Sequence, residues 1–256
     1  MIDPVAFEIA SFSIRWYGII IGLAFLLSLF LVIKEAEKQE IEEDFILDLF
    51  ILMLPLAIIG TRLYFVIFNW PFYRQNLSMI FAFRSGGLAI HGGIITGIIV
   101  LYYFCKKRRV SFFKITDLLA PYLALGQAIG RWGNFINQEA FGGVVSKEFI
   151  SIFPEFIQRQ MFIGGNYYHP AFLYESIWNF FVFLLLISLR KKDFVQKGDI
   201  FLLYIIGYSI GRLFIEGIRT DSLMLGPFRV AQLVSITAIL LGAIVLYKKH
   251  ISTKNE

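Results

Sequence analysis

Four polar side chains recur along the sixth long apolar stretch of this chain. Tyr208, Arg212, Glu216 and Arg219 follow one another at intervals of four, four and three residues, which in a helix places them on one face. Because a charge at the bilayer centre costs about 2.5–3.5 kcal/mol on insertion scales, such side chains usually face a cavity and have a partner. The pattern indicates a polar stripe that lines a site. An Arg212–Glu216 ion pair that only helps packing is the alternative.

The segment Gly130–Gly143, GRWGNFINQEAFGG, combines glycines with polar side chains at the end of another apolar stretch. Arg131, Asn134 and Asn137 recur at intervals of three residues, and Glu139 follows. Irregular backbone at membrane depth is tolerated only where it lines protein or a water-filled cavity, and glycine lets the backbone approach a ligand closely. The segment therefore predicts part of a binding site. A helix end and loop held by Asn and Gln caps would have the same composition.

Other ionisable residues stand alone in or beside apolar stretches. His91 opens the third stretch, either as a base or as a hydrogen-bonded structural residue. Arg62, in the second stretch, either binds a phosphate or supports the fold. Glu175, at the start of the fifth, could balance one of the arginines. Asp117, before the fourth, has a residue type typical of helix starts.

Arginine with asparagine, tyrosine and a few carboxylates suits an anionic headgroup, because Arg holds phosphate oxygens in a bidentate fork and stays ionised. The sequence has no Walker loop, Ser-His-Asp motif, aspartate-rich metal motif or nucleotide fingerprint. His91, His169 and His250 lack metal-ligand spacing, so neither a metal nor another cofactor is expected. These residues alone predict a polytopic membrane protein with an anionic, phospholipid-like ligand. A transporter or binder of that lipid and a lipid-modifying enzyme both remain open.

The composition places these residues in a membrane. Of the 256 residues, 57% are hydrophobic and 17% are charged, against about 25% charged in soluble domains. The single cysteine, Cys105, excludes an intrachain disulfide. Gly126, Gly130 and Gly133 are expected to break the fourth apolar run toward its end. Seven apolar runs are long enough to span a bilayer: Tyr17–Ile33, Phe45–Phe68, Leu88–Cys105, Leu118–Phe135, Ala171–Leu189, Ile200–Ile218 and Val230–Tyr247.

We therefore expect an all-α polytopic integral membrane protein, with residues 1–256 forming a single membrane domain of about seven transmembrane helices. Of the 24 Lys and Arg residues, 14 lie in one alternate set of loops and 8 in the other, counting Arg131. The positive-inside rule then places the N-terminus outside and the C-terminus in the cytoplasm. The loop Ile136–Pro170 becomes extracytoplasmic, and a hairpin turning at Gly164–Asn166 is expected within it.

The motif GRWGNFINQEAFGG resembles the signature of the prolipoprotein diacylglyceryl transferases, bacterial enzymes of the lipoprotein pathway. The resemblance implies a multi-pass protein of the bacterial cell (plasma or inner) membrane. Four further segments resemble the family's motifs and occur in its order along essentially the whole chain: Arg15–Gly18 (RWYG), Ser85–Gly93 (SGGLAIHGG), His169–Glu175 (HPAFLYE) and Tyr208–Arg219 (YSIGRLFIEGIR).

The resemblance also implies a reaction. The diacylglyceryl group of phosphatidylglycerol is transferred to the lipobox cysteine thiol of a preprolipoprotein signal peptide, a thioether forms and glycerol phosphate leaves, as the first step of lipoprotein maturation. The expected partners are phosphatidylglycerol, preprolipoprotein signal peptides and membrane lipids, without nucleic acid. Because the substrate supplies the nucleophile, the enzyme needs no cysteine of its own, and Cys105 is expected to be a packing residue.

This reaction gives each of the residues above an expected role. Arg131 and Arg212 are expected to hold the phosphate and to stabilise charge on the leaving group. His91 is the expected base for the thiol, since imidazole suits proton transfer near neutral pH; an arginine-rich field could instead favour the thiolate and leave His91 structural. The expected substrate-binding residues are these two arginines with Tyr17, Asn134, Asn137, Glu139, Gly142, Glu175, Tyr208, Glu216 and Arg219.

Overall fold

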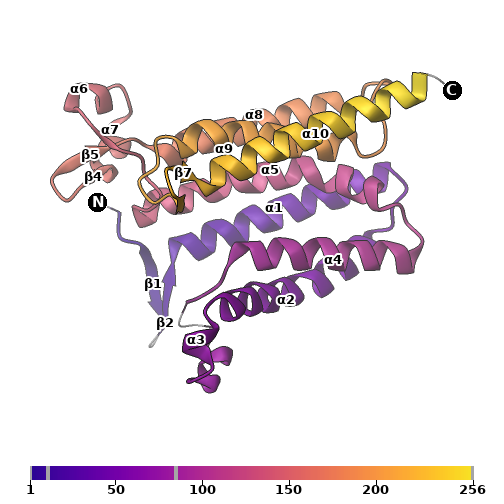
Figure 1. The fold of residues 1–256 in the computed structure, drawn as a ribbon. Helices are drawn as coiled ribbons and strands as arrows, with labels where there is room; N and C mark the ends of the chain where they lie inside the picture. The colour runs from indigo at the N-terminus through magenta and orange to yellow at the C-terminus, as the bar shows by residue number, and fades with distance from the viewer. Residues whose placement is uncertain (1, 10–11, 84–85, 255–256) are drawn as a thin grey trace. The chain divides into compact units, whose positions relative to one another are not determined.

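The computed structural model describes residues 2–9, 12–83 and 86–254. Each long helix overlaps one predicted apolar run, so the seven expected runs are confirmed as helices (Figure 1). Ser85, the first residue of the SGGLAIHGG segment, lies outside the described residues. Within the described residues, seven helices have 18 to 26 residues: α1 (Trp16–Lys38), α2 (Glu43–Phe68), α4 (Ile90–Arg108), α5 (Phe112–Asn137), α8 (Ala171–Leu189), α9 (Asp199–Glu216) and α10 (Val230–Lys254).

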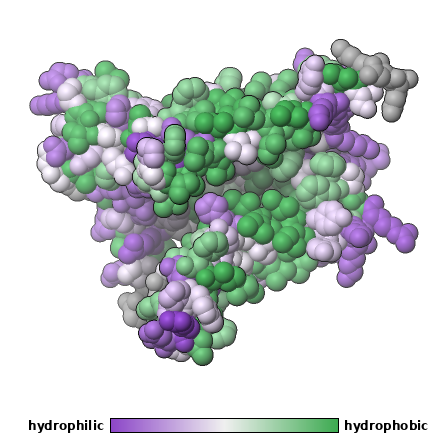
Figure 2. All heavy atoms as spheres, in the orientation of Figure 1, coloured by the Kyte–Doolittle hydropathy of each residue, from purple (hydrophilic) through white to green (hydrophobic). Residues whose placement is uncertain are grey.

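Four of these helices, α1, α2, α8 and α10, are long and apolar enough to cross a membrane by length and composition alone. The other three carry more charge; α9, for example, contains Asp199, Arg212 and Glu216. Large apolar side chains such as Phe181, Phe214 and Leu241 are more than half exposed, and apolar residues cover the visible surface of α8 to α10 (Figure 2). Such a surface suits lipid rather than water, and the chain is a polytopic membrane protein.

The chain forms two compact units, which are described separately. Unit 1 contains residues 1–32 and 116–256, and unit 2 contains residues 33–115. In unit 1, helices α8, α9 and α10 run alongside one another (Figure 1). A buried cluster joins α5 to α8 and α9, and its members are Ala120, Ala124, Val182, Leu186 and Ile200.

Helix α5 is unbroken to Asn137, so the expectation that its glycines interrupt the fourth run is wrong. The glycines instead let α1 approach closely. A Cβ atom on Gly133 would lie 2.7 Å from Tyr17 Cδ2, and one on Gly130 would lie 3.1 Å from Ile21 Cδ1. Small residues at a helix contact are a common way to bring membrane helices together. Irregular backbone begins only after Asn137.

Asp117 also differs from its predicted role. Helix α5 begins at Phe112, so Asp117 is an interior residue of that helix. Its carboxylate accepts hydrogen bonds from the backbone N–H groups of Gly198 and, at 2.9 Å, Phe201. These donors lie at the N-terminus of α9, where backbone N–H groups lack partners within the helix. Asp117 therefore caps a different helix from the one predicted.

The long loop between α5 and α8 forms a small folded region. It contains β3 (Val144–Val145), α6 (Lys147–Ile150), α7 (Glu155–Gln160), β4 (Phe162–Ile163) and β5 (Asn166–Tyr168), with the antiparallel strand order β3-β5-β4. This loop packs on the ends of α5 and α8 through a buried cluster that contains Phe135, Ile150, Ile157, Met161 and Phe172.

The hairpin predicted near Gly164–Asn166 is present. Ile163 pairs with Asn166, and the two turn residues Gly164 and Gly165 have φ of 56° and 88°. A two-residue turn with positive φ at both positions strongly favours glycine. Asn166 is the first residue of β5 rather than part of the turn.

Three of the loops of unit 1 lie at the same end of that unit. The backbone N–H of Ile2 donates to Gln160 at 2.8 Å, and Gly143 N–H donates to the Ile218 carbonyl at 2.9 Å. The N-terminal hairpin, β1 (Val5–Ile9) with β2 (Phe12–Arg15), therefore belongs to the same end as the long loop and the α9–α10 loop, which carries β6 (Met224–Leu225) and β7 (Phe228–Arg229).

Unit 2 is built on the helix pair α2 and α4. A Cβ atom on Gly92 would lie 2.2 Å from the carbonyl oxygen of Gly60, so the two backbones cross in contact. The loop between these helices contains α3 (Trp70–Tyr73) and the 3-10 helix η1 (Leu77–Phe81). Cys105 is 1% exposed within unit 2, as expected for a packing residue.

Candidate active site

Glu175 is the centre of a charged network in unit 1. Its Oε2 lies 2.5 Å from Nη2 of Arg131, and its Oε1 lies 3.0 Å from Nη1 of Arg219 and 3.4 Å from Nη1 of Arg212. Glu175 lies on the second turn of α8 and is 4% exposed. The sequence predicted that Glu175 could balance one arginine. In the structure this one buried carboxylate contacts three arginines.

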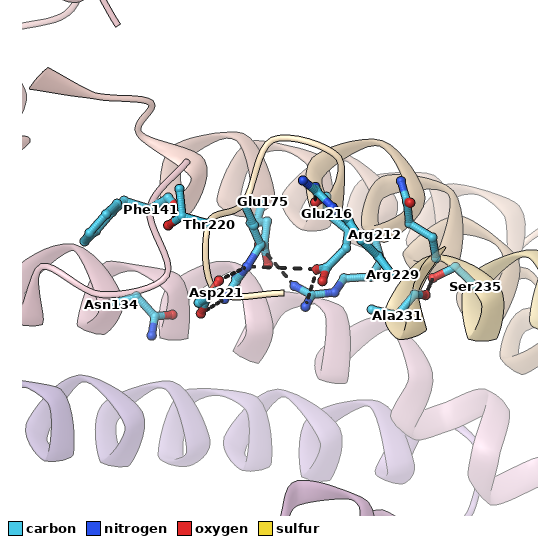
Figure 3. A network of polar contacts seen from close by, with 12 residues as sticks. Asn134, Phe141, Glu175, Arg212, Glu216, Thr220, Asp221, Arg229, Ala231 and Ser235 are labelled. Carbon is cyan, nitrogen blue, oxygen red and sulfur yellow. Dashed lines mark hydrogen bonds and ion pairs between the residues drawn. The ribbon is translucent and has the colours of Figure 1, made fainter. Parts of the chain in front are cut away.

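Glu216, the last residue of α9, is the second carboxylate of the network (Figure 3). Its Oε2 lies 2.6 Å from Nη2 of Arg212 one turn earlier, so the ion pair that the spacing allowed as an alternative interpretation is present. Arg229, from β7, donates to the backbone carbonyl of Glu216. Glu216 is 2% exposed. It holds Nη2 of Arg212, while Glu175 contacts Nη1 of the same guanidinium.

Arg219 is held more tightly than the other arginines. Its Nε and Nη2 donate to the two carboxylate oxygens of Asp221, at 2.9 and 2.7 Å, while Nη1 faces Glu175. Burial raises the pKa of Asp221, but the hydrogen bonds and charge of Arg219 outweigh it and leave that pKa below its usual range. The Arg219 side chain is only 9% exposed, so this residue supports the network from within.

Arg131 and Arg212 differ from Arg219 because each keeps an open face. Their side chains are 21% and 20% exposed. The charged residues around Glu175 are Arg131, Arg212, Arg219, Arg229, Glu216 and Asp221. Partly buried guanidinium groups with exposed donors can bind an anionic oxygen group.

A row of amides extends the network along the last turn of α5. Arg131 Nη1 donates to Asn134 Oδ1 at 3.3 Å, and Asn134 Nδ2 donates to Glu139 Oε1 at 2.8 Å. Asn137 Nδ2 reaches the same oxygen at 3.4 Å. Gln138 has positive φ, at 52°, which turns the chain back so that Glu139 lies beside the helix that it has just left. The structure therefore brings these predicted residues together.

Gly142 has a packing role. Its N–H donates to the carbonyl of His169 at 3.0 Å, and a Cβ atom at this position would lie 2.6 Å from His169 Cβ. A single bridge also pairs Gly142 with Arg219. The residue thus ties the segment after α5 to the start of α8 and to the end of α9, which positions the arginines of two helices.

Tyr17 and Tyr208 lie on different helices of unit 1 and contact different parts of the predicted set. Tyr17, on the first turn of α1, packs its ring on Gly133 and is 37% exposed. Tyr208 lines a small pocket between α8 and α9. The pocket is formed by Glu175, Trp178, Asn179, Tyr208, Gly211, Arg212 and Ile215.

His91 and Arg62 belong to unit 2 and are described within that unit. His91 is exposed on the first turn of α4, and its ring centroid lies 6.0 Å from that of Tyr64. Arg62 is 2% exposed and donates to the backbone carbonyls of Met79 and Ile80 in η1 and of Gly86. For Arg62 the structure supports the fold-supporting alternative, because its guanidinium holds the α2–α4 loop.

Several residues of the network and pocket were not predicted, among them two charged residues and one amide. Asp221 lies two residues after Arg219, and Arg229 lies in a β-hairpin whose contact with Glu216 no spacing rule gives. Asn179 follows Glu175 by four residues, so the same one-face rule that singled out Arg212 could have found it.

The fold and the site together define a class, a polytopic helical membrane protein with a buried cluster of arginines and carboxylates. The family model described as prolipoprotein diacylglyceryl transferase matches residues 4–248 of this chain. The chain therefore belongs to the prolipoprotein diacylglyceryl transferase family, which confirms the resemblance seen in its motifs.

Relatives of similar length agree with this assignment. A protein of Clostridium botulinum (strain 657 / Type Ba4) is 54% identical over 245 residues, which cover 96% of this chain and 98% of the relative. A protein of Clostridium novyi (strain NT) is 52% identical over 253 residues, 99% of this chain and 98% of its own length. One of Bacillus cereus (strain Q1) is 51% identical over 95% of this chain and 90% of its own. All three are named phosphatidylglycerol–prolipoprotein diacylglyceryl transferase.

Proposed function

We propose that the arginine network of unit 1 binds the phosphate of phosphatidylglycerol during the reaction of this family. The protein is a transferase of lipoprotein biosynthesis, which moves the diacylglyceryl group of phosphatidylglycerol to the lipobox cysteine of a prolipoprotein. One observation carries the assignment of the site. Glu175 holds Arg131 and Arg212 side by side, while each keeps about a fifth of its side chain exposed.

The chemistry explains why such a site is needed. The substrate sulfur attacks the glycerol carbon that bears the phosphate, a C–S bond forms, and the C–O bond to the phosphate breaks. The bonding electrons go to the phosphate oxygen, so glycerol phosphate leaves with more negative charge than it carried in the lipid. Donors aimed at developing charge in a site of low dielectric act strongly on the rate. Arg131 and Arg212 are positioned to act in this way.

Neighbouring residues would orient the lipid headgroup. Asn134, Asn137 and Glu139 form one connected row beside Arg131, and their amide and carboxylate groups suit the hydroxyls of the terminal glycerol. Arg219 and Glu216 would act indirectly, since both are buried and hold other members of the network. His91 remains our proposed base for the thiol. The electrostatic field of the arginines is the alternative, because positive charge stabilises a thiolate.

We also propose an orientation for the protein in the bacterial cell membrane. The excess of Lys and Arg in one set of loops places the N-terminus outside and the C-terminus in the cytoplasm. The arginine network belongs to the end of unit 1 that carries the N-terminal hairpin and the loop of residues 136–170. The site would then face the outer leaflet, where a signal peptide presents its lipobox. Residues 1–256 would form one membrane domain.

A transfer assay with purified protein tests the proposal. Phosphatidylglycerol is supplied with a lipobox peptide or with its Cys→Ser variant, and both products are measured. We expect thioether-linked diacylglyceryl peptide and released glycerol phosphate with the cysteine peptide only. Release of glycerol phosphate without peptide modification would mean hydrolysis. Saturable lipid binding without any turnover would favour a lipid transporter or binder.

A further inference from the structure

The pocket between α8 and α9 adjoins the arginine network, because Glu175 and Arg212 are part of its lining. On α8, Asn179 follows Glu175 by four residues, and on α9, Tyr208 precedes Arg212 by four residues. The two helices are joined by a short loop and run in opposite directions (Figure 1). Asn179 and Tyr208 therefore both lie about 6 Å farther along the helices than the Glu175–Arg212 pair.

A tryptophan fixes the two helices at this level. Trp178 Nε1 donates to the Gly207 carbonyl at 2.8 Å, which places the neighbouring residues of α8 and α9 opposite each other. Its ring lies across Gly211, where a Cβ atom would be only 2.1 Å from Trp178 Cδ1. The Trp178 hydrogen bond and the close approach of its ring to Gly211 therefore define the position of this wall of the pocket.

The pocket contains polar groups that the protein itself does not satisfy. Asn179 is 3% exposed, and among the described residues its side-chain amide has no hydrogen-bond partner. The Tyr208 hydroxyl likewise lacks one in the described part of the chain; its ring contacts Tyr204, at 6.2 Å between centroids. Because both residues line the pocket, their polar groups are available to a group bound there. The pocket has room for about one water-sized group.

We propose that Asn179 and Tyr208 form a subsite for an ester carbonyl of the diacylglycerol lipid whose phosphate lies on Arg131 and Arg212. This inference rests on the proposed function. An ester carbonyl follows the phosphate of a glycerophospholipid by a few bonds, a separation comparable with one helical turn of about 5.4 Å. A carbonyl oxygen is a single acceptor of water size, and both Asn179 and Tyr208 carry donors.

The subsite makes the enzyme specific for ester-linked chains. An alkyl ether has the same length but no carbonyl oxygen, so it would leave the Asn179 amide buried and unpaired. A site built to hydrogen-bond a substrate group discriminates against the analogue that lacks it for this reason. Arg212 borders both the network and the pocket, so it sets the register between the phosphate and the carbonyl.

The test compares three lipids in the transfer assay. They are phosphatidylglycerol with two ester chains and two analogues in which one ester, at either glycerol position, is replaced by an ether. With the wild-type protein we expect one analogue to lose about five- to tenfold in kcat/KM, as for one hydrogen bond. We expect the other to be used like the diester. Equal use of all three lipids by an active enzyme would overturn the subsite and leave the proposed function intact.

The variant Asn179→Leu separates recognition from intrinsic reactivity. This substitution keeps the side-chain volume and removes the amide. The kcat/KM for the diester lipid should therefore fall to that for the disfavoured ether lipid, whose own kcat/KM should change little. Ser188→Ala is the matched control on α8, because its hydroxyl donates to the Leu184 carbonyl of its own helix. The ratio of kcat/KM for the diester to kcat/KM for the disfavoured ether should equal that of wild type. If Asn179→Leu does not fold, Tyr208→Phe is judged by the same ratio.

Two further outcomes separate failure of the subsite from failure of the proposed function. Full discrimination in both Asn179→Leu and Tyr208→Phe would show that the pocket holds only a structural water, and the proposal would fall. No transfer from the diester by folded wild-type protein would instead refute the proposed function itself.

Discussion

The two ends of unit 1 each contain a buried carboxylate held by cations, and they are built differently. At one end, Glu175 is shared by three arginines. At the other, Asp199 is enclosed by Lys249 Nζ at 2.6 Å, His250 Nε2 at 2.8 Å and the backbone N–H of Gln196 at 2.7 Å. Asp199 is the first residue of α9, so this second cluster fastens α10 to the start of α9.

The comparison distinguishes a binding site from a cluster of ion pairs that only stabilises the packing of two helices. Asp199 accepts hydrogen bonds from its own loop and from the last turns of α10, and its side chain is only 3% exposed. At the Glu175 end one carboxylate is shared by three arginines, and two of these arginines keep about a fifth of the side chain exposed. Exposed guanidinium donors, rather than burial of an ion pair, are what an incoming phosphate needs.

The largest effect is expected from Glu175→Ala. Removal of this carboxylate leaves three guanidinium groups without their common partner, and breaking a buried pair costs about 3–5 kcal/mol of stability. Turnover should also fall about 100- to 1,000-fold, because the arginines lose their positions. Thermal unfolding in detergent and the transfer assay measure the two effects. Glu155→Ala, which removes an exposed carboxylate paired only with Arg159 on α7, should change neither.

Arg131→Ala and Arg212→Ala should separate activity from stability. Each removes a donor for the leaving phosphate, and loss of one such donor lowers kcat about 100- to 1,000-fold. Folding should change less than in Glu175→Ala, since the side chains are partly exposed. Arg→Lys should restore only part of the rate, because Lys cannot bind bidentately. Arg108→Ala, at an exposed pair with Asp48, is the control, and unchanged turnover in Arg131→Ala would contradict the assignment.

Asp199→Asn should lower stability without lowering turnover, the opposite of the arginine variants. The amide keeps the shape but loses the charge that holds Lys249 and His250, so the free energy of unfolding should fall by about 1–3 kcal/mol. Turnover of the folded fraction should stay at the wild-type level. Asp193→Asn, at an exposed position of the same loop, should leave both unchanged. A large loss of turnover in Asp199→Asn would mean that this end also takes part in catalysis.

The helices were predictable because each apolar run is long enough to span a bilayer. The Arg212–Glu216 pair was predictable for a similar reason, since a spacing of four residues is a property of one helix. Contacts between helices were not. That Glu175 serves three arginines depends on how α5, α8 and α9 pack, and no spacing along the chain encodes it.

The errors have the same origin. Asp117 has the residue type of a cap, and it is a cap, but for α9 across the unit. Gly130 and Gly133 resemble helix breakers, yet they form the face on which α1 packs. The sheet in the long loop has strands of two or three residues, which are too short for an alternating pattern to reveal.

The smallest effect is expected from Asp221→Asn, and it should depend on pH. The pKa of Asp221 is lowered in the folded protein, because Arg219 outweighs the effect of burial. A lowered folded-state pKa means that the stabilisation is present above the ordinary Asp value, about 3.9, and is lost as pH falls through the folded-state value. Because the Asp221 side chain is 51% exposed, screening keeps the effect below about 1 kcal/mol.

Unfolding temperatures of wild type and Asp221→Asn therefore should differ at pH 7 and converge as the pH is lowered below about 4. Asp193→Asn should show no such convergence, since that side chain is exposed and away from Arg219. A difference that grows at acid pH would mean that Arg219 does not depend on the charge of Asp221. Turnover at pH 7 should fall only slightly, because Glu175 still holds Arg219 at 3.0 Å, whereas in Glu175→Ala no second carboxylate takes over for Arg131.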